Sequence, residues 1–205
     1  MATSRKPGKL ITTATRRQPR QGPPAAGTLR VRDVVIFNGA PFKVPQCVQR
    51  IDTKSTHGWQ VRCHGTKMFS DHTRDGSGAR AALKLATREL LSRIATNPAP
   101  VSLQRAPSAN KSSSLPPGIS GPIVREREGR KSRTASLSVL LPRFGEQARI
   151  RSIYIGSEST YTLTKFRAAL AKAKALRAEA MATYEDAATK ARRQAARQLK
   201  AMLRD

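Results

Sequence analysis

Apolar residues recur along the chain in two patterns, alternating in short runs and helical in longer ones. The runs LRVRDVVIF, CVQRID, GWQVRCH and TKMFSDH are strand-like, and turn signals such as NGAPF and TKST separate them. The first of these strands is expected near 29–37. The next run, GSGARAALKLATRELLSRIA, repeats apolar residues from Leu83 to Ile94 at helical spacing, with Arg80, Lys84 and Arg88 on another face. We therefore expect residues 28–95 to form a three-stranded sheet with one helix.

The same order of elements returns after a stretch without periodicity. Residues 96–117 are rich in Pro, Ser and Ala, which is typical of a linker. Beyond them GPIVREREG, RTASLSVLLP and ARIRSIYIG are strand-like, and TLTKFRAALAKAKALRAEA is helical, with Thr162 or Thr164 as its cap. We interpret 118–180 as a diverged second copy. The predicted class is α+β, with two small units that each pack one helix on a three-stranded antiparallel sheet.

The two ends of the chain have patterns of their own. Residues 1–27 combine turn-forming and basic residues with few apolar ones, so we expect a disordered basic tail, with an organelle transit peptide as the alternative. Residues 181–205 continue the helical pattern as a basic, Ala-rich extension. Its apolar stripe predicts packing on the body of the protein or pairing with a second copy as a homodimer. An arm lying along DNA is the alternative.

Charge narrows the choice of partner. The 205 residues include 39 Lys and Arg against 13 Asp and Glu, a formal net charge of +26. Such a chain binds polyanions, because each neutralised phosphate releases a condensed counterion. The two cysteines suit a reducing compartment, and no apolar run is long enough for a membrane span. We expect a soluble, intracellular protein with no membrane partner.

The stretch THGWQVRCHGTKMFSDH holds the only Trp, all three His and one Cys, and raises the question of a metal or catalytic site. Cys63 and His64 are adjacent, so on a strand they point to opposite faces and lack the paired spacing of zinc ligands. Asp71 and His72 are neighbours too, and do not form a dyad. GSG at 76–78 indicates a turn that leads into a helix, with a phosphate cradle as the alternative. We expect no catalytic residue, metal or cofactor, and a core role for Cys63.

The strand GWQVRCH should have one inward and one outward face. Alternation turns Trp59 toward the helix and Arg62 outward. A register centred near Ser55 would place Ile51 opposite Trp59, and Arg50 then joins the outer face. Arg can match the edge of guanine, Gln the edge of adenine, and either can hold a phosphate. The residues predicted to bind nucleic acid in the first unit are Arg50, Gln60, Arg62, His64 and Lys67.

RIDTKSTHGWQVRCHGTKMFSDH followed by ALKLATRELL resembles the AP2/ERF-type, integrase-like DNA-binding domain in its bacterial and phage versions. A Gly-aromatic strand, a short third strand and an Ala/Leu helix carry this resemblance over 45–94. GISGPIVRE, ARIRSIYIGSESTY and FRAALAKAKALR look like a second copy over 118–177. The resemblance implies that the sheet enters the major groove and the helix supports it from behind. In the second copy it implies contacts by Arg125, Arg127, Arg151 and Tyr154.

Both copies depart from the family pattern. The second copy lacks an aromatic residue where Trp59 stands and carries Glu126 and Glu128 in its first hairpin. Docking of another protein, or of the first unit, is therefore the alternative role for it. Alternation from Ile153 also turns Arg151 inward, unless a bulge intervenes or the arginine lies beyond the helix. The first copy lacks the two-Arg first strand typical of plant members.

Together these patterns predict a non-enzymatic protein that binds double-stranded DNA with its sheet face. It would be a transcriptional regulator or a nucleoid- or phage-DNA-associated factor, and the resemblance implies the cytoplasm or nucleoid of a bacterial or phage-infected cell. Two alternatives remain open. One is an RNA- or ribosome-associated basic protein, and the other is a phage or mobile-element protein that binds an acidic host protein.

Overall fold

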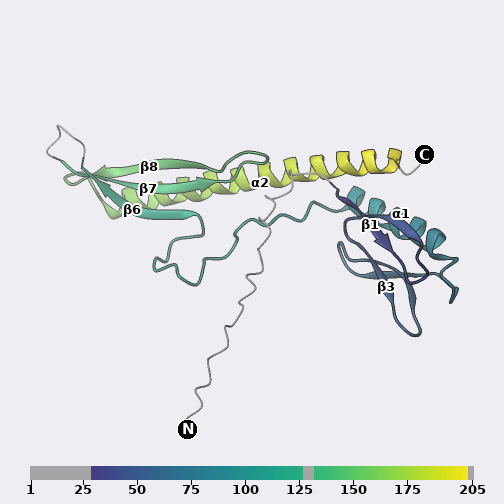
Figure 1. Cartoon of the computed structure of the whole chain (residues 1–205). Helices are drawn as coiled ribbons and strands as arrows, with labels where there is room; N and C mark the ends of the chain where they lie inside the picture. The colour runs from purple at the N-terminus through teal and green to yellow at the C-terminus, as the bar shows by residue number, and fades with distance from the viewer. Residues whose placement is uncertain (1–28, 127–131, 203–205) are drawn as a thin grey trace, which may run out of the picture.

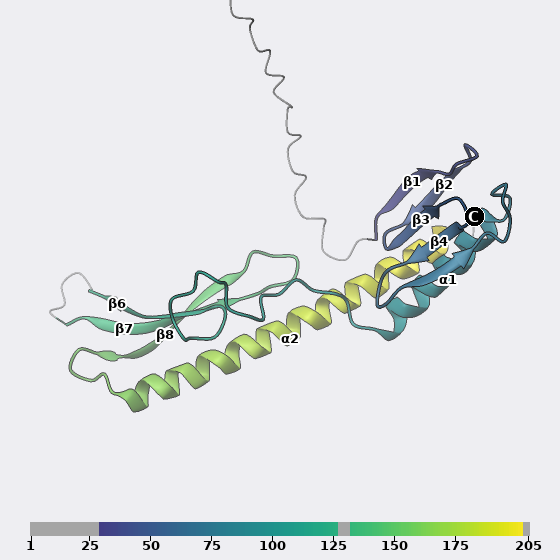
Figure 2. The same ribbon diagram turned by 90° about the horizontal axis from the view of Figure 1, so that it is seen from below.

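The structure of the chain is a computed structural model that describes residues 29–126 and 132–202. The predicted tail, 1–27, and Arg127 of the predicted site lie outside the described residues. The fold is α+β, and the described residues form antiparallel sheets of two, three and three strands with two helices. One of these is the long helix α2 (Leu163–Met202), which runs beside both parts of the fold (Figures 1 and 2).

The first unit comprises a hairpin, a sheet and a helix. The hairpin pairs β1 (Val31–Val35) with β2 (Pro41–Pro45), and the sheet has the order β3-β4-β5. The elements of this sheet and its helix are β3 (Val48–Asp52), β4 (His57–Val61), β5 (Lys67–Ser70) and α1 (Ala79–Thr96). Strand β2 was not predicted, because the prolines in PFKVP indicate a turn. Those prolines are tolerated because β2 pairs only with β1 and is an edge strand.

The core of the first unit lies between the β3-β4-β5 sheet and α1. Trp59, Val61 and Cys63 are buried, as alternation predicted, together with Ala86 and Leu90 of α1. A Cβ on Gly58 would collide with the carbonyl oxygen of Phe69 in the neighbouring strand, so only glycine fits before the tryptophan.

The predicted register of the β3–β4 hairpin was wrong by one residue. Arg50, not Ile51, lies opposite Trp59, and Asp52 lies opposite His57. Because side chains alternate along a strand, a slip of one residue moves every side chain of β3 to the other face. Arg50 therefore points to the inner face, and its predicted place on the outer face is wrong.

The second unit is a three-stranded sheet packed on the N-terminal half of α2. Its strands are β6 (Ile119–Arg125), β7 (Thr134–Leu141) and β8 (Arg149–Ser157), in the order β6-β7-β8. Leu137 and Val139 of β7 are fully buried and pack against a cluster that includes Ala169 and Ala173 of α2. Thr162 caps α2, since its hydroxyl accepts a bond from the N–H of Lys165 at 3.2 Å, which confirms one of the two predicted caps.

Helix α2 does not end with the second unit. Its 40 residues span about 60 Å at the usual rise, and its last turns reach the first unit. There Ala196 joins the first core, and Leu199 is only 4% exposed. The prediction that the extension packs on the body of the protein is thus confirmed. Met202, 70% exposed, is the part of the predicted apolar stripe that stays open.

The predicted linker has no regular secondary structure, but it is fastened along α2. The N–H of Ala99 donates to the hydroxyl of Thr189 at 3.0 Å, and Arg105 pairs with Glu185 at 2.6 Å. The linker then passes Arg177, which is buried and donates to the carbonyl oxygens of Leu140 and Gln104. Burial lowers the pKa of Arg177 from its ordinary value. Among the helices that the structure describes, none is long and apolar enough to cross a membrane.

Because α2 contributes to both cores, a substitution that destabilises the second unit should also lower the stability of the first unit. Ala173→Asp would place a carboxylate at a fully buried position, which costs about 3 kcal/mol. We expect Trp59 fluorescence, which reports on the first unit, to show a lower midpoint in urea. The matched control is Ala175→Asp, at an exposed position of the same helix. A Trp59 transition that is unchanged in Ala173→Asp would show that the two units unfold independently.

Candidate nucleic-acid interface

The outer face of the first sheet carries little charge. Arg62 is exposed and Gln60 is half-buried on this face, as predicted, and the Arg62 Nε donates to the Gln60 side-chain oxygen at 2.6 Å. His64 is exposed as well, but it lies beyond the end of β4 in a bend with a φ of +53°, so strand alternation does not place it on this face. The other side chains on it are neutral, namely Gln49, Ile51, Met68 and Ser70. Lys67 lies opposite Val61, at the edge of the inner face, and pairs with Glu89 of α1 at 3.2 Å. Among the described residues of the strands, none adds a second cation beside Arg62.

Arg50 is instead the centre of a polar network beneath the sheet. Its guanidinium binds Asp71 through two hydrogen bonds of 2.9 and 2.6 Å and Asp52 through its Nε at 3.0 Å. The Arg50 side chain is 7% exposed and that of Asp71 is not exposed at all. The guanidinium also lies 5.0 Å from the centre of the Trp59 ring. Arg50 thus holds β3, β5 and the tryptophan together and does not face a partner.

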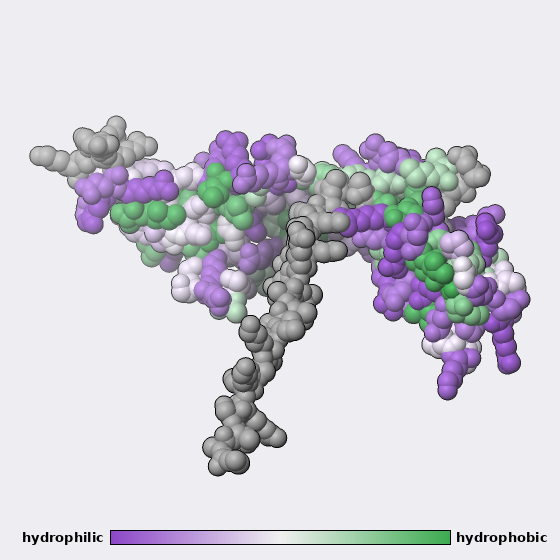
Figure 3. Space-filling view, in the orientation of Figure 1, coloured by the Kyte–Doolittle hydropathy of each residue, from purple (hydrophilic) through white to green (hydrophobic). Residues whose placement is uncertain are grey.

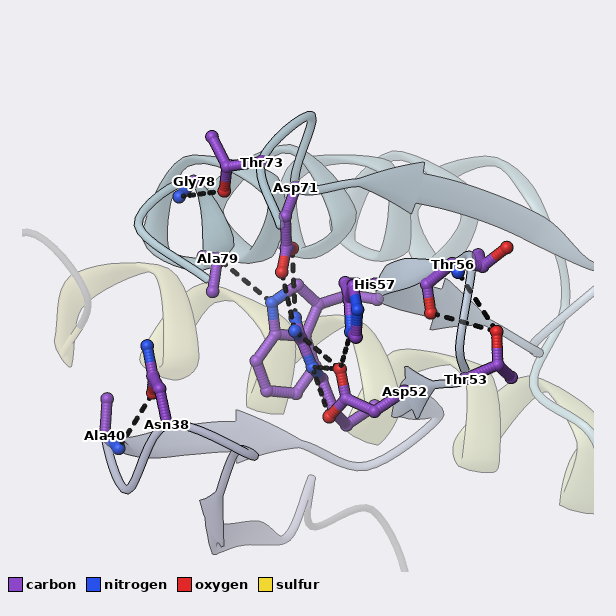
Figure 4. Close-up of polar contacts among 12 residues, drawn as sticks. Asn38, Ala40, Asp52, Thr53, Thr56, His57, Asp71, Thr73, Gly78 and Ala79 are labelled. Atoms are coloured by element: carbon purple, nitrogen blue, oxygen red, sulfur yellow. Dashed lines mark hydrogen bonds and ion pairs between the residues drawn. The ribbon is translucent and has the colours of Figure 1, made fainter. Parts of the chain in front are cut away.

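Asp52 also binds His57, so the network includes a His–Asp pair. The His57 Nδ1 lies 2.9 Å from the Asp52 carboxylate, and Figure 4 shows the two side chains pointing toward each other. Partial burial alone would raise the pKa of Asp52, but hydrogen bonds from Arg50 and His57 and the charge of Arg50 outweigh it and lower that pKa. Among the described residues, no hydroxyl or thiol is hydrogen-bonded to the His57 ring.

The start of α1 is held by its own loop. The N–H of Gly78 donates to the Thr73 hydroxyl (Figure 4). The N–H of Ser77 donates to the carboxylate of Asp75. The indole N–H of Trp59 donates to the carbonyl oxygen of Ala79 at 2.8 Å. Since the N–H groups of Ser77 and Gly78 already have partners within the loop, GSG at 76–78 acts as the turn that leads into α1 and not as a phosphate cradle.

The two cysteines belong to the contact between the first unit and α2. The Arg192 Nη2 lies 3.3 Å from the sulfur of Cys63 and 3.6 Å from that of Cys47. Burial and the neighbouring Cys63 raise the pKa of the Cys47 thiol, despite the opposing effect of Arg192. Across the described ranges, no three His, Cys, Asp or Glu side chains gather in a way that could hold a metal ion.

The predicted site residues of the second unit are spread over two faces. Tyr154, 61% exposed, lies opposite Ser136 on the outer face, and Arg125 lies opposite Thr134 on the same side. Arg151 lies opposite Val139, on the helix side, but at the open edge of β8 where it is exposed. A bulge does interrupt the β7–β8 pairing, between Ala135 and Ser136. The space-filling view shows mixed hydrophilic and apolar surface on both units (Figure 3).

Basic side chains gather where α1, β2 and the end of α2 meet. These elements enclose a groove of about 1140 Å³ that we call the basic groove. Its apolar floor includes Phe42, Leu83, Leu91, Ile94 and Ala196. Its cations are Lys43, Arg80, Lys84, Arg88, Arg193, Arg197 and Lys200.

The basic groove contains seven cations and no Asp or Glu among its lining residues. None of the seven forms an ion pair with another residue in the described ranges. The i, i+4 spacing of Arg80, Lys84 and Arg88 marks one basic stripe in the sequence, and Arg193 and Arg197 mark another. That the two stripes face each other depends on the return of α2 to the first unit, which no local pattern reveals.

Comparison with models of protein families, with curated proteins and with solved structures finds no match to this chain.

The inward position of Arg50 predicts a stability effect. Arg50→Ala would leave the buried Asp71 carboxylate without its partner, which costs about 3–5 kcal/mol when one member of a buried pair is removed. Chemical unfolding followed by far-UV circular dichroism measures the loss. Arg62→Ala, on the outer face of the same sheet, is the control and should leave the unfolding midpoint unchanged. Equal stability of the two variants would return Arg50 to the candidate binding residues.

Proposed function

We propose that this protein binds double-stranded DNA without catalysing a reaction on it, and that the basic groove is its main contact. The observation that carries the proposal is the gathering of seven cations around one groove, which make no ion pair with the residues that the structure describes, and no Asp or Glu is among the lining residues. A net charge of +26 spread evenly would be a property of composition alone. Seven of the 39 basic residues gather around one groove, and this gives a polyanion a defined place to bind.

The spacing of the cations fits a phosphate backbone. Arg80, Lys84 and Arg88 follow one another at one turn of α1, about 6 Å apart, which is close to the distance between successive phosphates along one strand. Arg193 and Arg197 repeat this spacing on α2. A strand of DNA laid in the groove would therefore meet a cation from each helix at nearly every phosphate.

Base reading by the first sheet is a separate part of the proposal. Arg62 and Gln60 are two side chains of its outer face that have the chemistry to contact base edges, as the AP2/ERF resemblance implied. With one cation on that face, they would add specificity and little affinity. A role as transcriptional regulator or as a nucleoid- or phage-DNA-associated factor goes with this part of the proposal.

RNA remains the principal competitor, because phosphate contacts do not distinguish the two polymers. The floor of the basic groove offers one aromatic side chain, Phe42, and it is half-buried beneath Arg80. Proteins that bind single-stranded nucleic acid usually present several aromatic side chains on which bases stack. This scarcity favours duplex DNA.

Salt dependence tests the groove directly. The logarithm of the DNA-binding constant should fall linearly with the logarithm of salt concentration, and each phosphate contact adds about 0.9 to that slope. Arg88→Ala combined with Arg197→Ala should reduce the slope by about 2 and weaken binding alike on all sequences. Fluorescence anisotropy with a labelled random duplex over a range of salt concentrations measures both.

The matched control is Lys54→Ala combined with Arg167→Ala. It removes the same two charges at exposed positions away from the groove, so both variants carry a net charge of +24 instead of +26. We expect its slope to stay near that of the unaltered protein. Equal slopes for the two variants would contradict the assignment of the groove, and complete displacement of the duplex by equimolar RNA would favour the RNA alternative.

A further inference from the structure

A second cation-lined cleft lies at the other end of α2. It is about 390 Å³ in volume and lies between β8 and the first turns of α2, and we call it the β8/α2 cleft. Arg151, Lys165 and Lys172 line it with Tyr154, and no Asp or Glu is among its lining residues. The Nζ of Lys165 donates a hydrogen bond to the carbonyl oxygen of Thr160 at 2.9 Å. The other two cations make no ion pair within the described part of the chain.

The position of this cleft on the sheet adds further donors. Strand β8 pairs only with β7, so its outer edge presents backbone N–H groups that no neighbouring strand uses. Arg149 lies on the same side of β8 as Arg151, opposite Leu141, and is exposed. Charged side chains and open backbone N–H groups in one place are suited to phosphate oxygens.

We propose that the β8/α2 cleft is a second DNA-phosphate site, which α2 holds at a fixed distance from the basic groove so that one duplex contacts both. This inference rests on the proposed function. Ala169 lines the cleft and Arg197 lines the groove. They are about 28 residues apart in one continuous helix, which corresponds to about 42 Å. At 3.4 Å per base pair this distance spans about 12 base pairs of B-form DNA.

The direction and rigidity of the two sites agree with a shared ligand. With 3.6 residues per turn, the cleft and the groove lie on sides of α2 that differ by roughly a quarter turn. The helix between them has no Gly or Pro, and the linker braces it through Thr189 and Glu185. The spacing is therefore set by the helix and not by a flexible tether.

The middle of α2 explains why two separate contacts are expected and not one continuous track. Glu179 and Asp186 are exposed on the side of the helix between the two sites. Their negative charges repel phosphate there, so a duplex would touch the protein at both ends of α2 and pass over the middle without contact.

Duplex length tests the inference. A duplex of 10 base pairs is too short to reach both sites, whereas one of 24 base pairs covers them with several pairs to spare. A longer duplex also offers more binding positions, which raises affinity only in proportion to their number. Simultaneous contact with both sites should raise the affinity at least tenfold more than the number of binding positions does, as expected for a linked second site. Fluorescence anisotropy with blunt duplexes of 10, 14, 18 and 24 base pairs measures the dependence.

The variant that removes the second site is Arg151→Ala with Lys172→Ala. We expect it to bind the 10-base-pair duplex as the unaltered protein does, but to lose the extra gain on the longer ones. Arg167→Ala with Lys174→Ala, exposed on the other side of α2, is the control and should keep the gain. Thermal unfolding of all three proteins checks that the fold is retained.

The outcomes separate this inference from the proposed function. If all three proteins show the same length dependence while Arg88→Ala with Arg197→Ala weakens binding, the second site is refuted and the basic groove stands. If the unaltered protein binds no duplex at any length, both proposals fail.

Discussion

The structure depends on one helix, α2, that packs its apolar residues into two separate hydrophobic cores. The N-terminal half of α2 buries Ala169 and Ala173 against β7 and β8, and its last turns bury Ala196 and Leu199 beside the first unit. The two buried stripes lie on sides of the helix that differ by about a third of a turn. Alanine at the contacts lets sheet and helix backbones approach closely, so a helix with few large apolar residues can still pack at both ends.

This double packing creates the charged surfaces. The basic groove exists because the end of α2 lies beside α1 and brings Arg193 and Arg197 opposite Arg80 and Arg88. Seven like charges around one groove repel one another, and the burial of the apolar floor has to offset that repulsion. A bound polyanion would remove the repulsion, so the arrangement that is costly in the free protein favours a phosphate ligand.

Local patterns predicted most of the elements but not the faces that depend on long-range contacts. The helices and all strands except β2, the Thr162 cap and the inward Trp59 follow from periodicity and turn chemistry. The inward position of Arg50 does not follow from these patterns, because the register of a hairpin depends on where its turn closes. The loop between β3 and β4 closes with Asp52 opposite His57, and the Asp52 carboxylate is hydrogen-bonded to the His57 ring.

The candidate site shows the same division. Both basic stripes that line the groove are visible in the sequence as i, i+4 repeats, but their meeting needs the return of α2 over about 60 Å. The predicted sheet face kept Arg62 and Gln60 and lost Arg50 and Lys67 to internal ion pairs. The structure therefore gathers most of the candidate binding cations on helices, whereas the sequence analysis had assigned the binding residues to strands.

The most direct test of the account is a lysine-reactivity footprint of the protein with and without saturating duplex DNA, read by mass spectrometry. The account predicts that Lys43, Lys84 and Lys200 of the basic groove are protected, while Lys54 and Lys174 react as in the free protein. Protection of Lys54 or Lys67 beside the sheet, with the groove lysines still reactive, would contradict it.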